Sequence, residues 1–290
     1  MAVLGIIGGS GLYDLPGLEE VEELDIDTPF GKPSSPVVRG RLGETTLLFL
    51  ARHGRGHTFT PTEVPYRANV FALAHLGATH VLSVSAVGSL REELPPGSAV
   101  IPDQIIDRTV SRERTFFEQG IVAHVGIADP FCADFSAQIA RASQPTSTPV
   151  VRGGTYVCIE GPQFSTKAES NLYRRWGASI IGMTAMPEAR LAREAELCYA
   201  SLAMVTDFDV WHDEEEPVTV EIVQKRMQRN TEAAIEIVAA LARQGLDERT
   251  CGCGHALAGA IITSPAHISP IVRERLDAIA GRYLNEGSQA

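Results

Sequence analysis

Residues 3–11, which read VLGIIGGSG, join a short apolar run to a glycine-rich turn. The run Val3–Ile7 is apolar at every position, as expected for a strand that helices cover on both faces. The turn Gly8–Gly11 ends the strand and carries one hydroxyl, that of Ser10. A buried strand with a polar turn at its carboxyl end is typical of an α/β sheet, where ligands collect at that end.

Four more apolar runs have the same form, each ending in a polar or glycine-containing group: Thr46–Ala51, Val81–Ala86, Ser179–Met183 and Tyr199–Val205. Amphipathic stretches lie between and after these runs and predict helices: Tyr66–Leu76, Phe164–Trp176, Pro187–Leu197, residues 218–243 and Ser269–Leu284. Strands and helices that alternate along the whole chain indicate one α/β domain. We therefore expect a single domain over residues 1–284 and a loose polar tail over residues 285–290.

The composition excludes several classes of protein. The 290 residues include 25 Lys and Arg and 36 Asp and Glu, a formal charge of −11, which argues against general binding to nucleic acid or anionic membranes. No apolar run approaches the ~20 residues that a membrane helix needs. The amino-terminal segment lacks the basic region and cleavage site of a signal peptide. Five cysteines do not make a disulfide scaffold, so we expect a cytoplasmic protein.

The turn at Gly8–Gly11 can point backbone N–H groups into an anion-binding nest. The dinucleotide fingerprint G-x-G-x-x-G fails, because Asp14 stands at its last glycine. A tight strand-to-helix turn is the alternative interpretation.

A basic cluster, RHGRGH over residues 52–57, follows the second strand directly. The Arg52 guanidinium is a planar fork that matches phosphate oxygens, and a buried Arg needs an anion. We therefore predict phosphate or sulfate there. The alternative is a surface loop that pairs with acidic neighbours.

Two carboxylates, Asp207 and Asp209, follow the most apolar strand. If the segment stays extended, both side chains point the same way. Two carboxylates in a dry pocket repel, so one should hold a proton near neutral pH and could give it to a leaving base. An Asx turn with solvated acids is the alternative.

Cys251 and Cys253 could bind a metal, form an exchangeable disulfide, or remain reduced thiols. The other three cysteines, Cys132, Cys158 and Cys198, lie in or beside apolar runs and are expected in the core. No H-E-x-x-H or comparable metal motif occurs, so we expect catalysis without a metal.

Taken in order, seven segments resemble the methylthioadenosine phosphorylases, within the trimeric branch of the purine nucleoside phosphorylase family: IIGGSGLY (6–13), FLARHGRGHT (49–58), VSAVGSLREEL (84–94), IDRTVSRERTFF (106–117), EGPQFSTKAES (160–170), GMTAMPEARLAREAELCYAS (182–201) and TDFDVW (206–211). The resemblance implies a central mixed β-sheet flanked by helices. It implies a pentosyltransferase that uses inorganic phosphate to split 5′-methylthioadenosine into adenine and 5-methylthioribose 1-phosphate, in purine and methionine salvage. No cofactor is implied, and the expected partners are the nucleoside, phosphate and further copies of the chain.

The resemblance also implies the roles of individual residues. A phosphate site is implied for Ser10, Arg52, His53, Ser85, Ala86 and Thr184. The base pocket would comprise Phe164, Ser165, Asp207 and Asp209, with Asp207 as the general acid. Met183 would contact the ribose, while Val220 and Val223 would line the methylthio pocket. His124 would reach a neighbouring subunit, in a homotrimer or a hexamer of two trimers.

Two other functions are compatible with parts of the pattern. An enzyme of the same fold could act on methylthioinosine or on 6-oxopurine nucleosides, where Asn usually replaces the residue at position 207. A nucleotide-sensing protein could be built on the GGSG turn, but it would leave Asp207 and Asp209 without a role.

Overall fold

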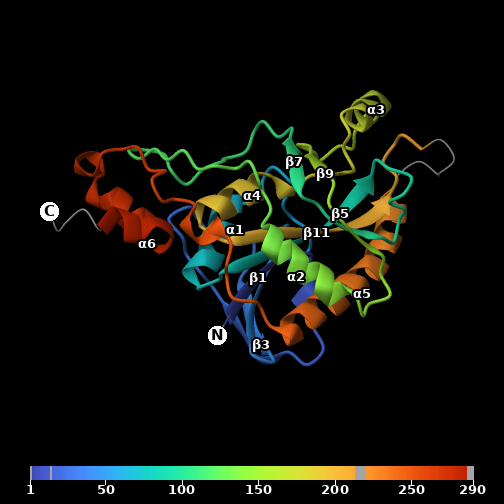
Figure 1. The fold of residues 1–290 in the computed structure, drawn as a ribbon, viewed down its shortest axis with the longest axis horizontal. Helices are drawn as coiled ribbons and strands as arrows, with labels where there is room; N and C mark the ends of the chain where they lie inside the picture. Colours follow the sequence, from blue (N-terminus) through green and yellow to red (C-terminus); the bar gives the residue numbers. More distant parts are fainter. Residues whose placement is uncertain (1, 14, 213–219, 286–290) are drawn as a thin grey trace.

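A single 11-stranded sheet organises the chain, and the computed structural model describes residues 2–13, 15–212 and 220–285 (Figure 1). The strands are β1 (Ala2–Gly8), β2 (Glu19–Leu24), β3 (Val37–Leu42), β4 (Thr45–Ala51), β5 (His80–Ser89), β6 (Ala99–Ile101), β7 (Gln104–Asp107), β8 (Val150–Arg152), β9 (Thr155–Cys158), β10 (Ile180–Gly182) and β11 (Cys198–Asp207). The helices are α1 (Tyr66–His75), α2 (Ala133–Ser143), α3 (Lys167–Arg175), α4 (Ala185–Glu194), α5 (Val220–Gln244) and α6 (Pro270–Asn285). Three short 3₁₀ helices are η1 (Ser10–Tyr13), η2 (Gly252–His255) and η3 (Pro265–His267).

The sheet is mixed, as predicted. Its main order is β2-β3-β4-β1-β5-β10-β9-β7, and β11 pairs with β5 and leads to β6 and β8. The strands β4, β1, β5 and β11 run parallel, so their carboxyl ends meet at one edge. β10 runs antiparallel to β5 and ends beside Gly88.

Helices cover both faces of the sheet, and the alternation of side chains along the strands explains why. In β1, Leu4 and Ile6 join one buried cluster with α2 and α5, while Ile7 joins the other with α1 and α4. In β4, Leu47 and Leu48 divide in the same way. The prediction that these strands are covered on both sides is confirmed.

The predicted helices are all present, with shifted ends. α3 begins at Lys167 rather than at Phe164, because Thr166 caps it in a reciprocal arrangement with Glu169. Within α4, Met186 has extended dihedral angles, so the regular helix begins at Pro187, as the sequence predicted. None of the helices in the described ranges has the length and apolar run required to cross a bilayer.

Candidate active site

A pocket of about 270 Å³ lies where the parallel strands end. Ten of the residues predicted for the site line it: Arg52, His53, Ser85, Ala86, Phe164, Ser165, Met183, Thr184, Asp207 and Asp209. They come from the carboxyl ends of β4, β5, β10 and β11 and from the segment before α3. The structure thus brings together segments that are far apart in the sequence.

Four predicted residues are not in this set. The side chains of Ser10, Val220 and Val223 lie outside what the structure describes, although Gly9 beside Ser10 does line the pocket. His124 is exposed on a loop, where its backbone N–H donates to the carbonyl of Ala260 at 2.9 Å. It does not line the pocket of its own chain.

An interruption in the sheet exposes the backbone of β5 to the pocket. β1 pairs with β5 only as far as Ser83, and β10 pairs from Gly88 onward. The carbonyl of Val84 points into this interval, because it accepts a hydrogen bond from Arg52 Nη1 at 2.9 Å. Backbone direction alternates along a strand, so the N–H of Ala86 points the same way. Ala86 is also exposed although β5 is otherwise mostly buried, which suits a backbone donor for an anion.

Arg52 is buried, and the anion beside it is the carboxylate of Glu188. Arg52 Nε donates to Glu188 Oε2 at 3.0 Å and Nη2 to Oε1 at 3.1 Å. Nη2 also donates to the Ile7 carbonyl and the Ser83 hydroxyl, and the Tyr199 hydroxyl donates to Glu188 at 2.9 Å. The predicted external anion therefore has a competitor inside the chain, because Glu188, which no motif in the sequence singles out, already pairs with Arg52. Arg52 still lines the pocket, so its charge contributes a positive field that Glu188 partly offsets.

His53 is held as a neutral acceptor. Its Nδ1 lies 2.9 Å from the Phe59 carbonyl, which can only accept, so Nδ1 carries the proton. Burial, together with the positive charge of Arg52, lowers the pKa of His53 to about 4. Nε2 is therefore free of a proton at neutral pH. Such a nitrogen can accept the O–H of a singly protonated phosphate.

Of the two geometries that the sequence allows for the carboxyl groups, the structure has the turn. The segment does not stay extended, because Asp209 has a φ of 52°. The chain turns, and the N–H of Asp209 donates to Asp207 Oδ1 at 2.8 Å. Thr206 Oγ1 donates to Asp207 Oδ2 at 2.7 Å. Both carboxyl groups nevertheless line the same pocket.

The environment of Asp209 raises the pKa of its carboxyl group toward neutral pH. Burial and, to a smaller extent, the charge of Asp207 raise its pKa, the nearby Ser170 hydroxyl lowers it, and the resulting pKa is about 6. Ser170 Oγ and Asp209 Oδ2 are not within hydrogen-bond geometry of any partner among the described residues. A carboxyl group able to hold a proton near neutral pH is therefore present in the pocket.

Two further residues shape the pocket. A Cβ atom added at Gly88 would lie 2.9 Å from Asp207 Oδ1, so only glycine leaves room for that carboxylate. Arg112 is buried and donates to the carbonyls of Met183 and Met186, each at 2.6 Å. It fixes the loop that carries Met183 and Thr184. The sequence gives no specific signal for this role of Arg112.

Comparison with known proteins agrees with this geometry. A family model described as the phosphorylase superfamily matches residues 3–243. The chain belongs to this superfamily. Within the superfamily, it is 52% identical over 283 residues to S-methyl-5′-thioadenosine phosphorylase of Geobacter sulfurreducens. This alignment covers 97% of this chain and 99% of the relative.

Solved structures of the superfamily share the fold. A methylthioadenosine phosphorylase from an Antarctic soil metagenomic library superposes with a TM-score of 0.89 at 45% identity, covering 96% of this chain and 98% of that one. Methylthioadenosine phosphorylase of Schistosoma mansoni, in complex with adenine, has a TM-score of 0.80 at 40% identity and covers 84% and 92%. The family expected from the sequence is confirmed.

Proposed function

We propose that this chain catalyses the phosphorolysis of 5′-methylthioadenosine, giving adenine and 5-methylthioribose 1-phosphate. The observation that carries the proposal is the meeting, in one pocket, of a backbone-lined anion site and a buried acid pair. The names of the relatives support the choice of nucleoside. No metal or organic cofactor is part of the proposed reaction; inorganic phosphate is a co-substrate.

Phosphate would bind against the stretch of β5 between Ser83 and Gly88, which has no paired strand on one side in the described part of the chain. The Ala86 N–H, the hydroxyls of Ser85 and Thr184, and the turn at Gly9 and Ser10 supply donors, and His53 Nε2 supplies an acceptor. Phosphate needs no base, because it is already an anion. It needs alignment about 3 Å from the sugar carbon that it attacks, and the bound charge then stabilises the cationic sugar as the bond to adenine breaks.

Adenine leaves as the acid pair protonates it at N7. Asp207 lies at the end of β11, where Thr206 and the N–H of Asp209 hold its carboxylate. Asp209 supplies a carboxyl group whose pKa lies close to neutral pH, so the pair can hold one proton. The half-exposed ring of Phe164 would form one wall for the base, and Met183 would contact the ribose.

The decisive assay measures phosphate-dependent base release from methylthioadenosine, adenosine and inosine side by side. We expect methylthioadenosine to give the highest kcat/KM. For Asp207→Asn we expect a loss of about 10²–10⁴-fold with methylthioadenosine and relatively better use of inosine, because Asn can donate to O6. Unchanged kcat/KM for methylthioadenosine in Asp207→Asn would refute the role of Asp207. Faster turnover of methylthioinosine or inosine by the unmodified enzyme would instead favour a 6-oxopurine phosphorylase.

A homotrimer, alone or paired as a hexamer, is proposed as the active unit, with His124 entering a neighbour's site. The exposure of His124 outside its own pocket supports this. Co-refolding His124→Ala with Asp207→Asn tests it, because a mixed trimer contains sites with both residues intact. The mixture is expected to turn over methylthioadenosine faster than either variant alone. Failure of the mixture, with assembly verified by light scattering, would refute the shared site.

A further inference from the structure

Four of the five cysteines meet at one point, away from the pocket described above. The sulfur atoms of Cys132, Cys198, Cys251 and Cys253 all lie within 4.8 Å of one another, and all are free thiols. The sulfurs of Cys198 and Cys251 are 3.4 Å apart. The fifth cysteine, Cys158, lies elsewhere, against the backbone of Met186. Cys132 and Cys198 are buried, as predicted, but the sequence did not indicate that they join the Cys-x-Cys pair.

The spacing of the four sulfurs suits a tetrahedral metal ion. A zinc–sulfur distance of ~2.3 Å places the sulfurs of a tetrahedral site ~3.8 Å apart. The observed separations, 3.4 Å for one pair and at most 4.8 Å for the others, surround that value. A disulfide would use two of the sulfurs and leave two thiols beside it. Four sulfurs converging from three separate parts of the chain are better explained by one shared ion.

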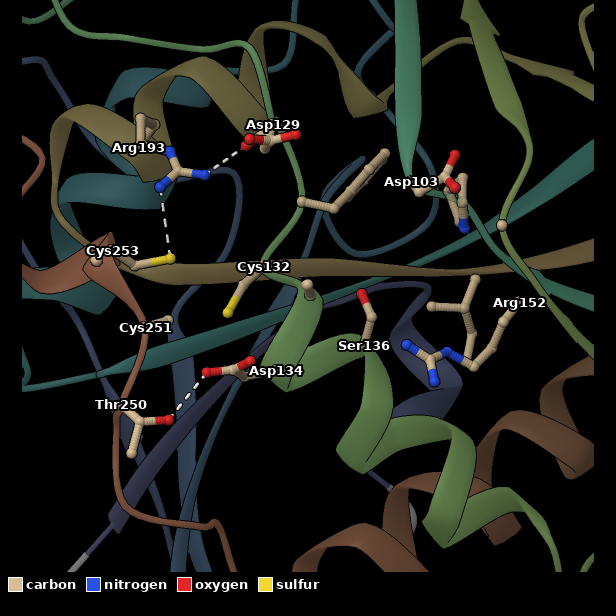
Figure 2. A pocket seen from close by; sticks show the side chains of 16 residues that line it. Asp103, Asp129, Cys132, Asp134, Ser136, Arg152, Arg193, Thr250, Cys251 and Cys253 are labelled. Carbon is tan, nitrogen blue, oxygen red and sulfur yellow. Dashed lines mark hydrogen bonds between the residues drawn. The ribbon is translucent and has the colours of Figure 1, made fainter.

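Hydrogen-bond donors around the cluster would stabilise the negative charge of cysteine thiolates. Arg193 Nη1 donates to Cys253 Sγ at 3.4 Å. The N–H of Phe135 donates to Cys132 Sγ at 3.5 Å, where Cys132 caps the amino terminus of α2. A cleft of about 720 Å³ lies beside the cluster. Figure 2 shows Arg193 directed at Cys253 along one side of this cleft, with Cys132 nearby. Outer donors of this kind hold metal-bound thiolates and are part of such sites.

We propose that Cys132, Cys198, Cys251 and Cys253 form a structural zinc site. Binding would displace the thiol protons and join Zn²⁺ to four thiolates, a closed set of ligands without a position for substrate. The ion would fasten the segment between α5 and α6 to the start of β11 and to α2. Thr250, which donates to Asp134 at 3.0 Å, already marks this contact. Cys198 begins β11 and Asp207 ends it, ten residues in all, so the ion would lie ~30 Å from the acid pair and serve the fold.

Metal analysis of the full-length protein tests the proposal. The protein is expressed with added zinc, purified with a phosphine reductant and without chelators, and measured by plasma mass spectrometry. We expect about one zinc per chain, and less than about a tenth of that in Cys251→Ser, whose thiol is the least buried of the four. Cys158→Ser is the matched control and should keep its zinc. Replacement by Co²⁺ should give the visible and charge-transfer bands of a tetrahedral thiolate site.

Three results would overturn the proposal, and none depends on a variant that folds. The first is unmodified protein that holds neither zinc nor cobalt. The second is one iron per chain in place of zinc, since iron also accepts four thiolates. The third is a count of three thiols instead of five in a separate preparation that is purified and denatured without any reductant, because it would reveal a disulfide. Zinc content is independent of phosphorolysis, so this outcome and that of the base-release assay can be told apart.

Discussion

Replacing Asp209 by Asn would separate the effect of this buried acid on the free energy of unfolding from its effect on turnover. Burial raises its pKa to about 6, from a reference value of 3.8. The pKa of Asp209 is higher in the folded chain than in the unfolded chain, so its ionisation destabilises the folded state. This destabilisation is absent below about pH 4 and complete above about pH 6. At ~1.36 kcal/mol per pH unit, ionising this carboxyl group in the folded chain costs ~3 kcal/mol.

Asparagine keeps the shape of the side chain, tolerates the φ of 52° and cannot ionise. At pH 7.5 the free energy of unfolding of Asp209→Asn should exceed that of the unmodified protein by up to ~3 kcal/mol. For 290 residues this corresponds to a rise in Tm of about 5 °C. At pH 4 the two proteins should unfold at nearly the same temperature. Turnover of methylthioadenosine should fall about 10²–10⁴-fold.

The assay is thermal unfolding at pH 4, 5, 6 and 7.5, at fixed protein and phosphate concentrations because both shift Tm by mass action. Asp25→Asn, at an exposed site, is the matched control and should show no pH-dependent gain. A Tm gain for Asp209→Asn that is equal at pH 4 and pH 7.5 would refute the reasoning, since the gain would then not come from ionisation.

Three more substitutions test the geometry of the pocket. Gly88→Ala should displace Asp207 by several tenths of an ångström and lower kcat about tenfold, whereas Gly126→Ala, whose added Cβ meets no atom within 4 Å, should leave kcat unchanged. Glu188→Gln should lower Tm, because Arg52 loses its buried counter-charge. It should also lower the KM for phosphate, because the phosphate would then balance the charge of Arg52. Added phosphate should therefore raise the Tm of Glu188→Gln more than that of the unmodified protein. His53→Gln should raise the KM for phosphate. It should also reduce the loss of stability between pH 6.5 and pH 4, because the pKa of His53 is lower in the folded chain than in the unfolded chain. If the Tm of His53→Gln falls with pH as steeply as that of the unmodified protein, His53 is not buried in its neutral form.

Continuous apolar runs in the sequence predicted β1, β4, β5, β10 and β11. The other strands were missed, including β3, whose Val37 and Val38 face the two layers but which also contains Arg39 and Arg41. β2 reads EEVEEL and is mostly exposed at the edge of the sheet, where Arg39 and Arg41 of β3 pair with its glutamates. β6, β8 and β10 have three residues each, too few for a period to emerge, and only β10 was predicted. The helix α2 was missed as well, although its apolar face is regular.

For the site, the residue types at strand ends predicted which segments meet but not which partner each side chain takes. Glu188 lies 136 residues from Arg52 in the sequence, and only tertiary packing brings the two together. The turn at Asp209 depends on a left-handed backbone that few side chains favour, so the sequence alone left both an extended segment and an Asx turn open. The four clustered thiols come from distant segments, which a spacing rule cannot detect.

The interval in β5 has a consequence for how the molecule responds to its ligands. Between Ser83 and Gly88 the strand lacks a neighbour on one side, and an oxyanion seated there would accept amide hydrogens as a missing strand would. Bound phosphate would then complete the hydrogen bonding of this part of the sheet. The amide of Ala86 should exchange its hydrogen slowly when phosphate is bound and quickly when it is withdrawn, so the enzyme would be stiffest at the moment when its co-substrate is in place.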